Sequence, residues 1–193
     1  MQVVLASTSP RRKMLLKGLV KNFKVIAPQF DEEEVIAQNP YNIALASAIF
    51  KADSVRALLK NKKCVIIGCD TIVVLKNKLL GKPLGEKNAY KMLKELSGKK
   101  HSVISGLCVF DEIHKKVYVD IEESFVYFKK LSEKEIIDYI KTGEPLDKAG
   151  AYAIQGKGRK FVKKYTGSYT NIVGLPVEKL KKILKKVKSD VNH

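Results

Sequence analysis

The turn at residues 5–12, LASTSPRR, collects side chains that could hold a phosphate. Hydroxyl and guanidinium donors stand close together in it, on Ser7, Ser9, Arg11 and Arg12. Ser9-Pro10 is typical of a helix start, and the free N–H groups of a helix N-terminus attract anions. An ordinary capped helix with two exposed arginines fits the same residues. The turn lacks the glycine spacing of a Walker A loop or a dinucleotide fingerprint, so those folds are not indicated.

A carboxylate stands inside the most apolar stretch of the chain. Residues 64–75, CVIIGCDTIVVL, predict a central strand covered on both faces, and Asp70 interrupts it. A buried carboxylate is costly unless a cation, a metal or several donors compensate it. Asp70 could therefore face a ligand, or it could be a structural Asp paired with a lysine or with backbone amides. Thr71 would point to the opposite face of a regular strand.

Three further charges stand at positions that restrict their direction. Lys51 lies in an alanine-rich helical stretch, where an inward ammonium requires an anion. Lys82 sits in the rigid turn Gly81-Lys82-Pro83, and Glu32 belongs to an acidic loop and could join Asp70 as an oxygen ligand for Mg²⁺ or Mn²⁺. Each charge alone also fits an exposed surface residue, so a shared function is indicated only if the folded chain brings these side chains together.

Cysteine and histidine chemistry is not indicated. The chain has three cysteines and three histidines, without CxxC spacing or a paired metal pattern. We expect buried thiols, no disulfides and no Ser-His-Asp triad. These residues are Cys64, Cys69, Cys108, His101, His114 and His193.

Strand and helix patterns alternate along the chain. They predict an α/β protein with a mixed sheet, because two neighbouring strand patterns read as a hairpin. We expect strands at 3–6, 23–27, 64–75, 101–110 and 116–129, and helices at 10–19, 40–59, 86–96, 133–141 and from 176 onward. We expect irregular structure at 142–158.

Composition limits the partners. The 193 residues are 45% hydrophobic and carry 37 Lys+Arg against 20 Asp+Glu, a formal charge of +17. The lysine excess is spread along the chain, which favours a solvated surface over a nucleic-acid stripe. No apolar run reaches the roughly 20 residues of a membrane span, and nothing resembles a signal peptide, so we expect a cytoplasmic protein.

Taken together, the motifs resemble the Maf family of nucleoside triphosphate pyrophosphatases from residue 3 to about 180. In order, they are LASTSPRR, Asp31-Glu32, Lys51-Ala52, GCDTIVV, GKPLG, SGKKHSVISGLCV, TGEPLDKAGAYAIQGKG and GSYTNIVGLP. Arg11, Thr71 and Gln155 match the positions that mark the branch acting on dTTP and UTP. The resemblance implies one domain, 1–193, with two α/β lobes around a long mixed sheet and a cleft between them, similar to inosine triphosphatases.

The resemblance also implies roles for individual residues. Asp70 would accept the proton of the attacking water as the bond between the α and β phosphates breaks. Glu32 would join Asp70 at a divalent metal, Mg²⁺ or Mn²⁺. Phosphate or charge-stabilising contacts would come from Ser7, Arg11, Arg12, Lys51 and Lys82. A glutamine amide, with one donor and one acceptor, complements the carbonyl and imide N–H of uracil or thymine, which suits Gln155.

Two alternatives remain open at this stage. The chain could hydrolyse other modified nucleotides, such as a methylated GTP, or it could be a nucleic-acid-binding or division-regulating protein supported by its charge. The expected partners are a small nucleotide and a second copy of the chain in a homodimer, with no membrane and no nucleic acid.

Overall fold

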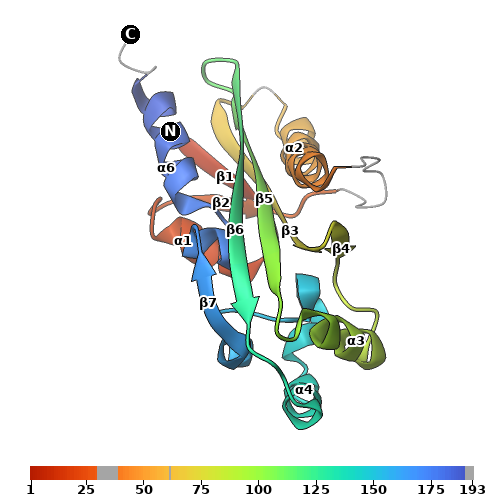
Figure 1. The fold of residues 1–193 in the computed structure, drawn as a ribbon. Coiled ribbons are helices and arrows are strands. Elements are labelled where there is room, and N and C mark those ends of the chain that lie inside the picture. Colours follow the sequence, from red (N-terminus) through yellow and green to blue (C-terminus); the bar gives the residue numbers. More distant parts are fainter. Residues whose placement is uncertain (30–38, 61, 190–193) are drawn as a thin grey trace. The chain divides into compact units, whose positions relative to one another are not determined.

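A computed structural model describes residues 1–29, 39–60 and 62–189 of the chain. Within these ranges the strands form one mixed sheet in the order β2-β1-β3-β5-β6-β7, with β4 paired to β3 (Figure 1). The strands are β1 (Gln2–Ala6), β2 (Lys24–Ile26), β3 (Cys64–Leu75), β4 (Lys78–Leu80), β5 (Lys100–Asp111), β6 (Lys116–Phe128) and β7 (Val162–Thr166). Strand β1 runs parallel to β2 and β3, whereas β4 and β7 pair antiparallel with their neighbours. The expected α/β class with a mixed sheet is confirmed.

The helices follow the predicted order, apart from the short helix Tyr169–Val173, which was not predicted. They are α1 (Pro10–Lys17), α2 (Pro40–Leu58), α3 (Glu86–Leu96), α4 (Glu133–Ile140), α5 (Tyr169–Val173) and α6 (Val177–Ser189). Helix α1 ends two residues earlier than expected, at a cap on Gly18. The segment expected to be irregular, 142–158, holds the short 3-10 turns η2 (Glu144–Asp147) and η3 (Ala149–Ala151) and the start of η4 (Lys157–Phe161). None of the helices in the described ranges is long and apolar enough to span a membrane.

The chain divides into two compact units. Unit 1 comprises Met1–Asp70, Ser105–Glu122 and Gly174–His193, and unit 2 comprises Thr71–Ile104 and Glu123–Val173. Strands β3, β5 and β6 contribute residues to both units. Helices α1, α2 and α6 therefore belong to unit 1, and α3, α4 and the 3-10 turns belong to unit 2.

Unit 1 has apolar layers on both faces of its strands. Val3 and Leu5 of β1 join a core formed with α1 and α6. Val4 and Ala6, which alternate with them, join a second core formed with α2. A strand buried on both faces is expected to be mostly apolar, which explains the hydrophobic run of β3 on either side of Asp70.

Helix α2 lies unusually close to the strands beneath it. A Cβ atom added to Gly68 of β3 would stand 2.2 Å from the carbonyl oxygen of Ala48, and one on Gly106 of β5 would stand 2.2 Å from that of Ala44. Glycine in the strands and alanine on the helix leave no side-chain layer between the two backbones. This contact places the following turn of α2, which carries Lys51, against β3.

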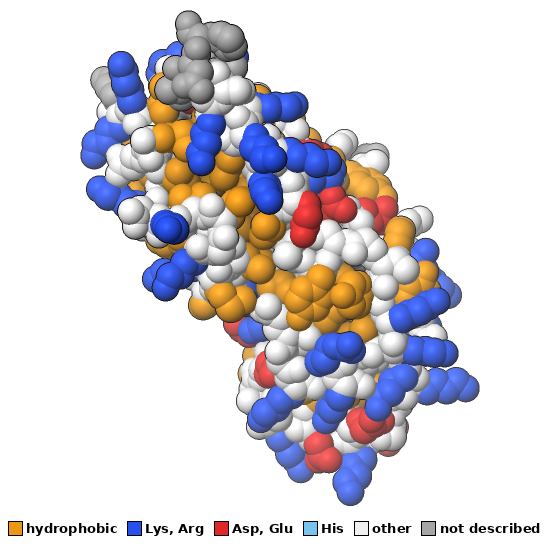
Figure 2. Space-filling model, turned by 90° about the vertical axis from the view of Figure 1, so that its left-hand side faces the viewer, with side chains coloured by type: hydrophobic (Ala, Val, Ile, Leu, Met, Phe, Trp, Pro, Cys, Tyr) orange, Lys and Arg blue, Asp and Glu red, His pale blue; other side chains and the backbone are white. Residues whose placement is uncertain are grey.

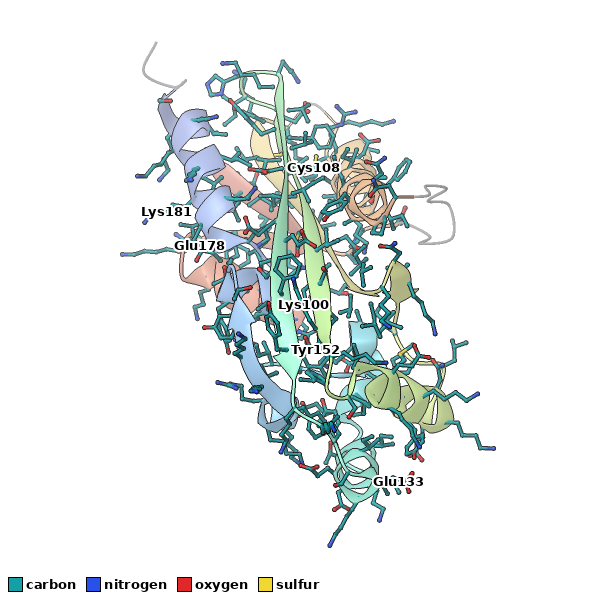
Figure 3. All side chains as sticks on the ribbon, in the orientation of Figure 1. Lys100, Cys108, Glu133, Tyr152, Glu178 and Lys181 are labelled. Atoms are coloured by element: carbon teal, nitrogen blue, oxygen red, sulfur yellow. The ribbon has the colours of Figure 1, made fainter. Side chains whose placement is uncertain are left out.

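The surface charge is dispersed. Figure 2 shows Lys and Arg side chains spread over one face of the molecule rather than gathered in a single stripe. The three thiols take no part in this surface, because Cys64, Cys69 and Cys108 are free and buried, as expected (Cys108 is labelled in Figure 3). Burial raises the pKa of the Cys108 thiol to about 12.

Candidate active site

The turn between β1 and α1 is built by its two serines. The Ser9 hydroxyl accepts a hydrogen bond from the Arg12 N–H at 3.5 Å, which caps α1 as predicted. The Ser7 hydroxyl accepts one from the Ser9 N–H at 3.2 Å, and Ser7 itself is buried. The capped helix is thus confirmed. Its N-terminal end stands at the carboxyl end of β1, where parallel strands commonly present ligand-binding groups.

Arg12 is not the exposed arginine that the capped-helix interpretation expects. Its Nε donates to the carbonyl oxygen of Gly174 at 2.9 Å, and its Nη1 donates to the Ser7 hydroxyl at 3.5 Å. Its Nη2 lies 4.0 Å from Oδ1 of Asp70, and only 13% of the side chain is exposed. The guanidinium is therefore directed inward, while Arg11 is half-buried in the same turn of α1.

Lys51 completes the cluster from the opposite face of the sheet. Its Nζ lies 2.5 Å from Oδ1 of Asp70, and both residues are buried. The sequence indicated that an inward ammonium on this apolar helix would need an anion, and Asp70 is that anion. The close packing of α2 on Gly68 brings the two charges together.

The four residues form a compact electrostatic site. Two cations, Lys51 and Arg12, flank the carboxylate of Asp70, with the Ser7 hydroxyl beside them. Pairing offsets the cost of burying the carboxylate in β3. Because two positive charges face one negative charge, the cluster also favours an incoming anion.

The remaining predicted site residues lie elsewhere in the chain. Thr71 follows Asp70 in β3 and is half-buried. Lys82, in the turn after β4, and Gln155 both have exposed side chains in unit 2. The predicted metal ligand Glu32 lies outside the described residues. The structure thus brings together Ser7, Arg12, Lys51 and Asp70 within unit 1.

The donor set limits how a metal ion could bind. Among the residues that the structure describes, no three His, Cys, Asp or Glu side chains cluster as a protein-only metal site requires. The cluster described above contributes one carboxylate, Asp70. Mg²⁺ is commonly held by one or two carboxylates together with substrate phosphates and water, so these residues fit the ion in the company of a phosphate ligand.

Sequence reasoning missed Glu144. Its carboxylate accepts hydrogen bonds from the Tyr139 hydroxyl at 2.9 Å, from the Lys157 N–H at 2.9 Å and from the Gly158 N–H at 3.2 Å. Burial raises the pKa of Glu144, but these donors outweigh it and hold the pKa below its usual value. The two glycines at 156 and 158 were the available signal, since they leave room for a neighbouring side chain.

His101 was also given no partner by the sequence. Its Nε2 lies 2.8 Å from the Tyr152 hydroxyl, and both rings pack edge-on against Phe128 (Tyr152 is labelled in Figure 3). Burial lowers the pKa of His101 to about 4, so the ring is neutral near pH 7. His101 therefore belongs to an aromatic cluster of unit 2.

Comparison with known proteins adds the family context. Residues 2–187 match the family model described as Maf-like protein. A dTTP/UTP pyrophosphatase of Clostridium tetani is 47% identical over 190 residues, which covers 97% of this chain and 98% of the relative. A protein of the same name from Aquifex aeolicus is 45% identical over 187 residues, with 97% and 96% covered.

Solved structures support the fold. The chain is similar to a HAM1 protein from Coxiella burnetii, with a TM-score of 0.53 and 14% identity, covering 96% of this chain and 99% of the other. The Ham1 protein of Staphylococcus aureus gives a TM-score of 0.52 at 17% identity, with the same coverage. These likenesses confirm the predicted relation to inosine triphosphatase-like folds.

Proposed function

Because the chain belongs to the Maf-like protein family, we propose that it hydrolyses dTTP and UTP to the nucleoside monophosphate and pyrophosphate. Relatives named dTTP/UTP pyrophosphatase match almost the full chain at 43–47% identity. The observation that carries the proposal is the cluster in which Lys51 and Arg12 flank the buried carboxylate of Asp70. It offers a base and cations in one place, as release of pyrophosphate requires.

The cations bind the triphosphate in this proposal. Lys51 and Arg12 neutralise Asp70 in the free protein, and phosphate oxygens share their charge when substrate binds. Ser7 adds a hydroxyl donor from the same turn, and Arg11 and Lys82 add further positive charge. Negative charge grows on the leaving pyrophosphate, so cations fixed beside it lower the barrier.

Asp70 acts as the general base. A water oxygen attacks the α phosphorus, the bond from that phosphorus to the bridging oxygen breaks, and the electron pair leaves with pyrophosphate. The proton of the water passes to the Asp70 carboxylate. General acid–base catalysis of this kind contributes about 10²- to 10⁴-fold to a rate.

A divalent cation, Mg²⁺ or Mn²⁺, belongs to the proposal. Asp70 would hold it together with Glu32, and it would neutralise phosphate charge. Selection of the nucleobase of the substrate is assigned to Gln155. Thr71 and Arg11 are the other residues that mark the pyrimidine branch. A fixed amide pairs with the carbonyl and imide N–H of thymine or uracil, and would have to flip to pair with cytosine.

We also propose a cellular compartment, an oligomeric state and a binding partner for the enzyme. Three free, buried thiols suit the reducing cytoplasm, where we place the protein. We further propose that residues 1–193 act as one domain and that two copies form a homodimer. The binding partner of the protein is a small nucleotide. The Lys and Arg side chains on the face shown in Figure 2 are dispersed and do not form the stripe that a nucleic acid would need.

A nucleotide panel tests the function directly. Purified protein is incubated with dTTP, UTP, CTP, dATP, GTP and 7-methyl-GTP, with Mg²⁺, with Mn²⁺ and with EDTA, and released pyrophosphate is measured. We expect turnover of dTTP and UTP that depends on metal. Absence of pyrophosphate from both would refute the proposal, and a preference for methylated GTP would replace it with the alternative substrate class. The Asp70→Asn protein is the control for contaminating phosphatases.

A further inference from the structure

We propose that Glu144 is a positioning residue for substrate selection, because its carboxylate fixes the loop that carries Gln155. The inference rests on the proposed function, in which the Gln155 amide recognises the pyrimidine base. Glu144 lies 11 residues before Gln155 in the sequence. It acts through the loop at residues 153–158, here named the glutamine loop.

The glutamine loop is wrapped around the Glu144 carboxylate. Two successive backbone N–H groups, of Lys157 and Gly158, point at its two oxygens from 2.9 and 3.2 Å. The Tyr139 hydroxyl donates to Oε1 at 2.9 Å. Three donors on one carboxylate hold the backbone just after Gln155 in a single arrangement.

The space around this carboxylate is fully used. A Cβ atom on Gly156, the residue after Gln155, would stand 2.3 Å from Oε1 of Glu144. A Cβ on Gly158 would stand 2.9 Å from the Tyr139 hydroxyl oxygen. The glycines are therefore a close fit: a side chain at residue 156 would occupy the position of the Glu144 carboxylate, and one at residue 158 would press on Tyr139 and on the backbone of Ala153.

Tyr139 holds the other end of the same loop. Its hydroxyl oxygen accepts a hydrogen bond from the Ala153 N–H at 3.3 Å, and its ring packs edge-on against Phe161 at 5.0 Å between centroids. Ala153 and Gly158 bracket Gln155 on both sides. The backbone is thus pinned before and after an exposed side chain, which leaves the amide as the part that faces solvent.

Pinning matters for selection because an amide recognises a base by the order of its donor and acceptor. A loop that can tilt or rotate presents the amide in several orientations, and cytosine can then pair as well as uracil. Fixing the loop beforehand also lowers the entropic cost of binding. Glu144 should therefore affect the choice between nucleotides more than the chemical step at Asp70.

Glu144→Gln tests this by replacing one carboxylate oxygen with an NH₂ group. The amide keeps one acceptor but turns an NH₂ donor toward a backbone N–H, so at least one of the three hydrogen bonds is lost. We expect the ratio of kcat/KM for UTP over CTP to fall about 5- to 10-fold, with KM for UTP rising more than kcat falls. Amide hydrogen exchange at Lys157 and Gly158 should accelerate in the same protein.

The double variant separates positioning from general damage. If Glu144 acts through Gln155, then Glu144→Gln added to Gln155→Ala leaves the UTP/CTP ratio where Gln155→Ala alone put it. Glu135→Gln is the matched control, because Glu135 also accepts three hydrogen bonds in unit 2, from the Ser132 N–H, the Ser132 hydroxyl and Lys129. The control should keep the wild-type ratio.

The outcomes distinguish the inference from the proposed function. Faster exchange with an unchanged UTP/CTP ratio would overturn the inference while the function stands. A wild-type protein inactive on dTTP and UTP would overturn the function itself, and the assigned role of Glu144 with it. Should Glu144→Gln fail to fold, Tyr139→Phe keeps the ring but removes one donor to the carboxylate and the acceptor of the Ala153 N–H. It should also lower the same ratio, and no change in that ratio would refute the inference.

Discussion

Asp70 and Asp111 are two buried carboxylates on neighbouring strands, and their partners differ in kind. Asp111, at the end of β5, accepts hydrogen bonds from the N–H groups of Ile113 and His114 at 3.0 and 3.2 Å and lies 2.6 Å from the His114 ring. All of these belong to the turn that follows it. Asp70 instead has Lys51 from α2 and Arg12 from α1, 19 and 58 residues away.

The contrast shows how one residue type serves structure in one place and chemistry in another. Backbone N–H groups cannot leave Asp111 without unfolding its turn, so that carboxylate is a fixed part of the β5–β6 connection. Side-chain cations can shift toward an incoming phosphate and return. A buried Asp in an apolar strand is therefore only a candidate, and its partners decide between the two roles.

The largest expected effect is on turnover. Asp70→Asn keeps the shape of the side chain but removes the proton acceptor, so kcat for dTTP should fall by about 10²- to 10⁴-fold while the far-ultraviolet circular dichroism stays the same. Pyrophosphate release measures it, with Asp111→Asn as the matched control that stays active. A variant at Asp70 that keeps most of its activity would place Asp70 with Asp111 as a structural carboxylate.

The next effect concerns the charge pair. Lys51→Met leaves the Asp70 carboxylate buried with Arg12 4.0 Å away, and breaking a buried pair on one side costs about 3 kcal/mol of unfolding free energy. Asp70→Asn in the same chain should recover much of that loss, because the buried carboxylate that lost its lysine partner is then neutral. Urea unfolding of the single and double variants checks the cycle. Simple addition of the two losses would show that the ions are not coupled.

His101 extends the comparison to a buried group without a charged partner. Its pKa of about 4 in the folded protein lies below the ordinary value near 6.5, so the unfolded chain binds more protons between these values. This contribution to stability is complete above pH 6.5 and is lost as the pH falls toward 4, by about 2 kcal/mol at pH 5. Urea unfolding at pH 8 and pH 5 should show a smaller pH effect in His101→Gln than in the wild type. Equal effects in the two proteins would contradict a neutral, buried ring.

The smallest effect belongs to Asp111. Asp111→Asn keeps an oxygen for the backbone N–H groups but weakens the contact with the His114 ring, so the unfolding free energy should fall by about 1–2 kcal/mol. Nucleotide turnover should be unchanged at temperatures where the variant is folded. A drop in kcat without a drop in stability would overturn the division between the two carboxylates.

Much of the fold could be predicted because its signals are local. Ser9, Asn39 and Ser132 each cap the helix that they were expected to start, and the side chain of each accepts the capping hydrogen bond. Strand β4 was missed, since its only signal is the turn Lys76-Asn77, where both residues have positive φ and one is an Asn. Strand β7 and helix α5 are five residues each, too short for a periodic pattern.

The site was less predictable because it depends on contacts distant in the sequence. The inward direction of Lys51 followed from its apolar helix, whereas nothing local showed that Arg12 turns toward Asp70 and the carbonyl of Gly174. The role of Glu144 arises from the fit of a loop 13 residues away. The roles assigned to Lys82, Glu32 and Gln155 remain predictions.

The close contact between Gly68 and α2 determines how precisely Lys51 is positioned in the site. With 2.2 Å between the Ala48 oxygen and the position of a Cβ on Gly68, one methyl group would push the helix outward by about 1 Å to reach ordinary contact. A misplacement of that size is enough to impair catalysis, although Gly68 itself has no side chain with which to touch a nucleotide. The position of the Lys51 ammonium relative to Asp70 thus depends on the absence of a Cβ atom at residue 68. The activity of variants at this residue would measure how accurately the enzyme must hold its charges.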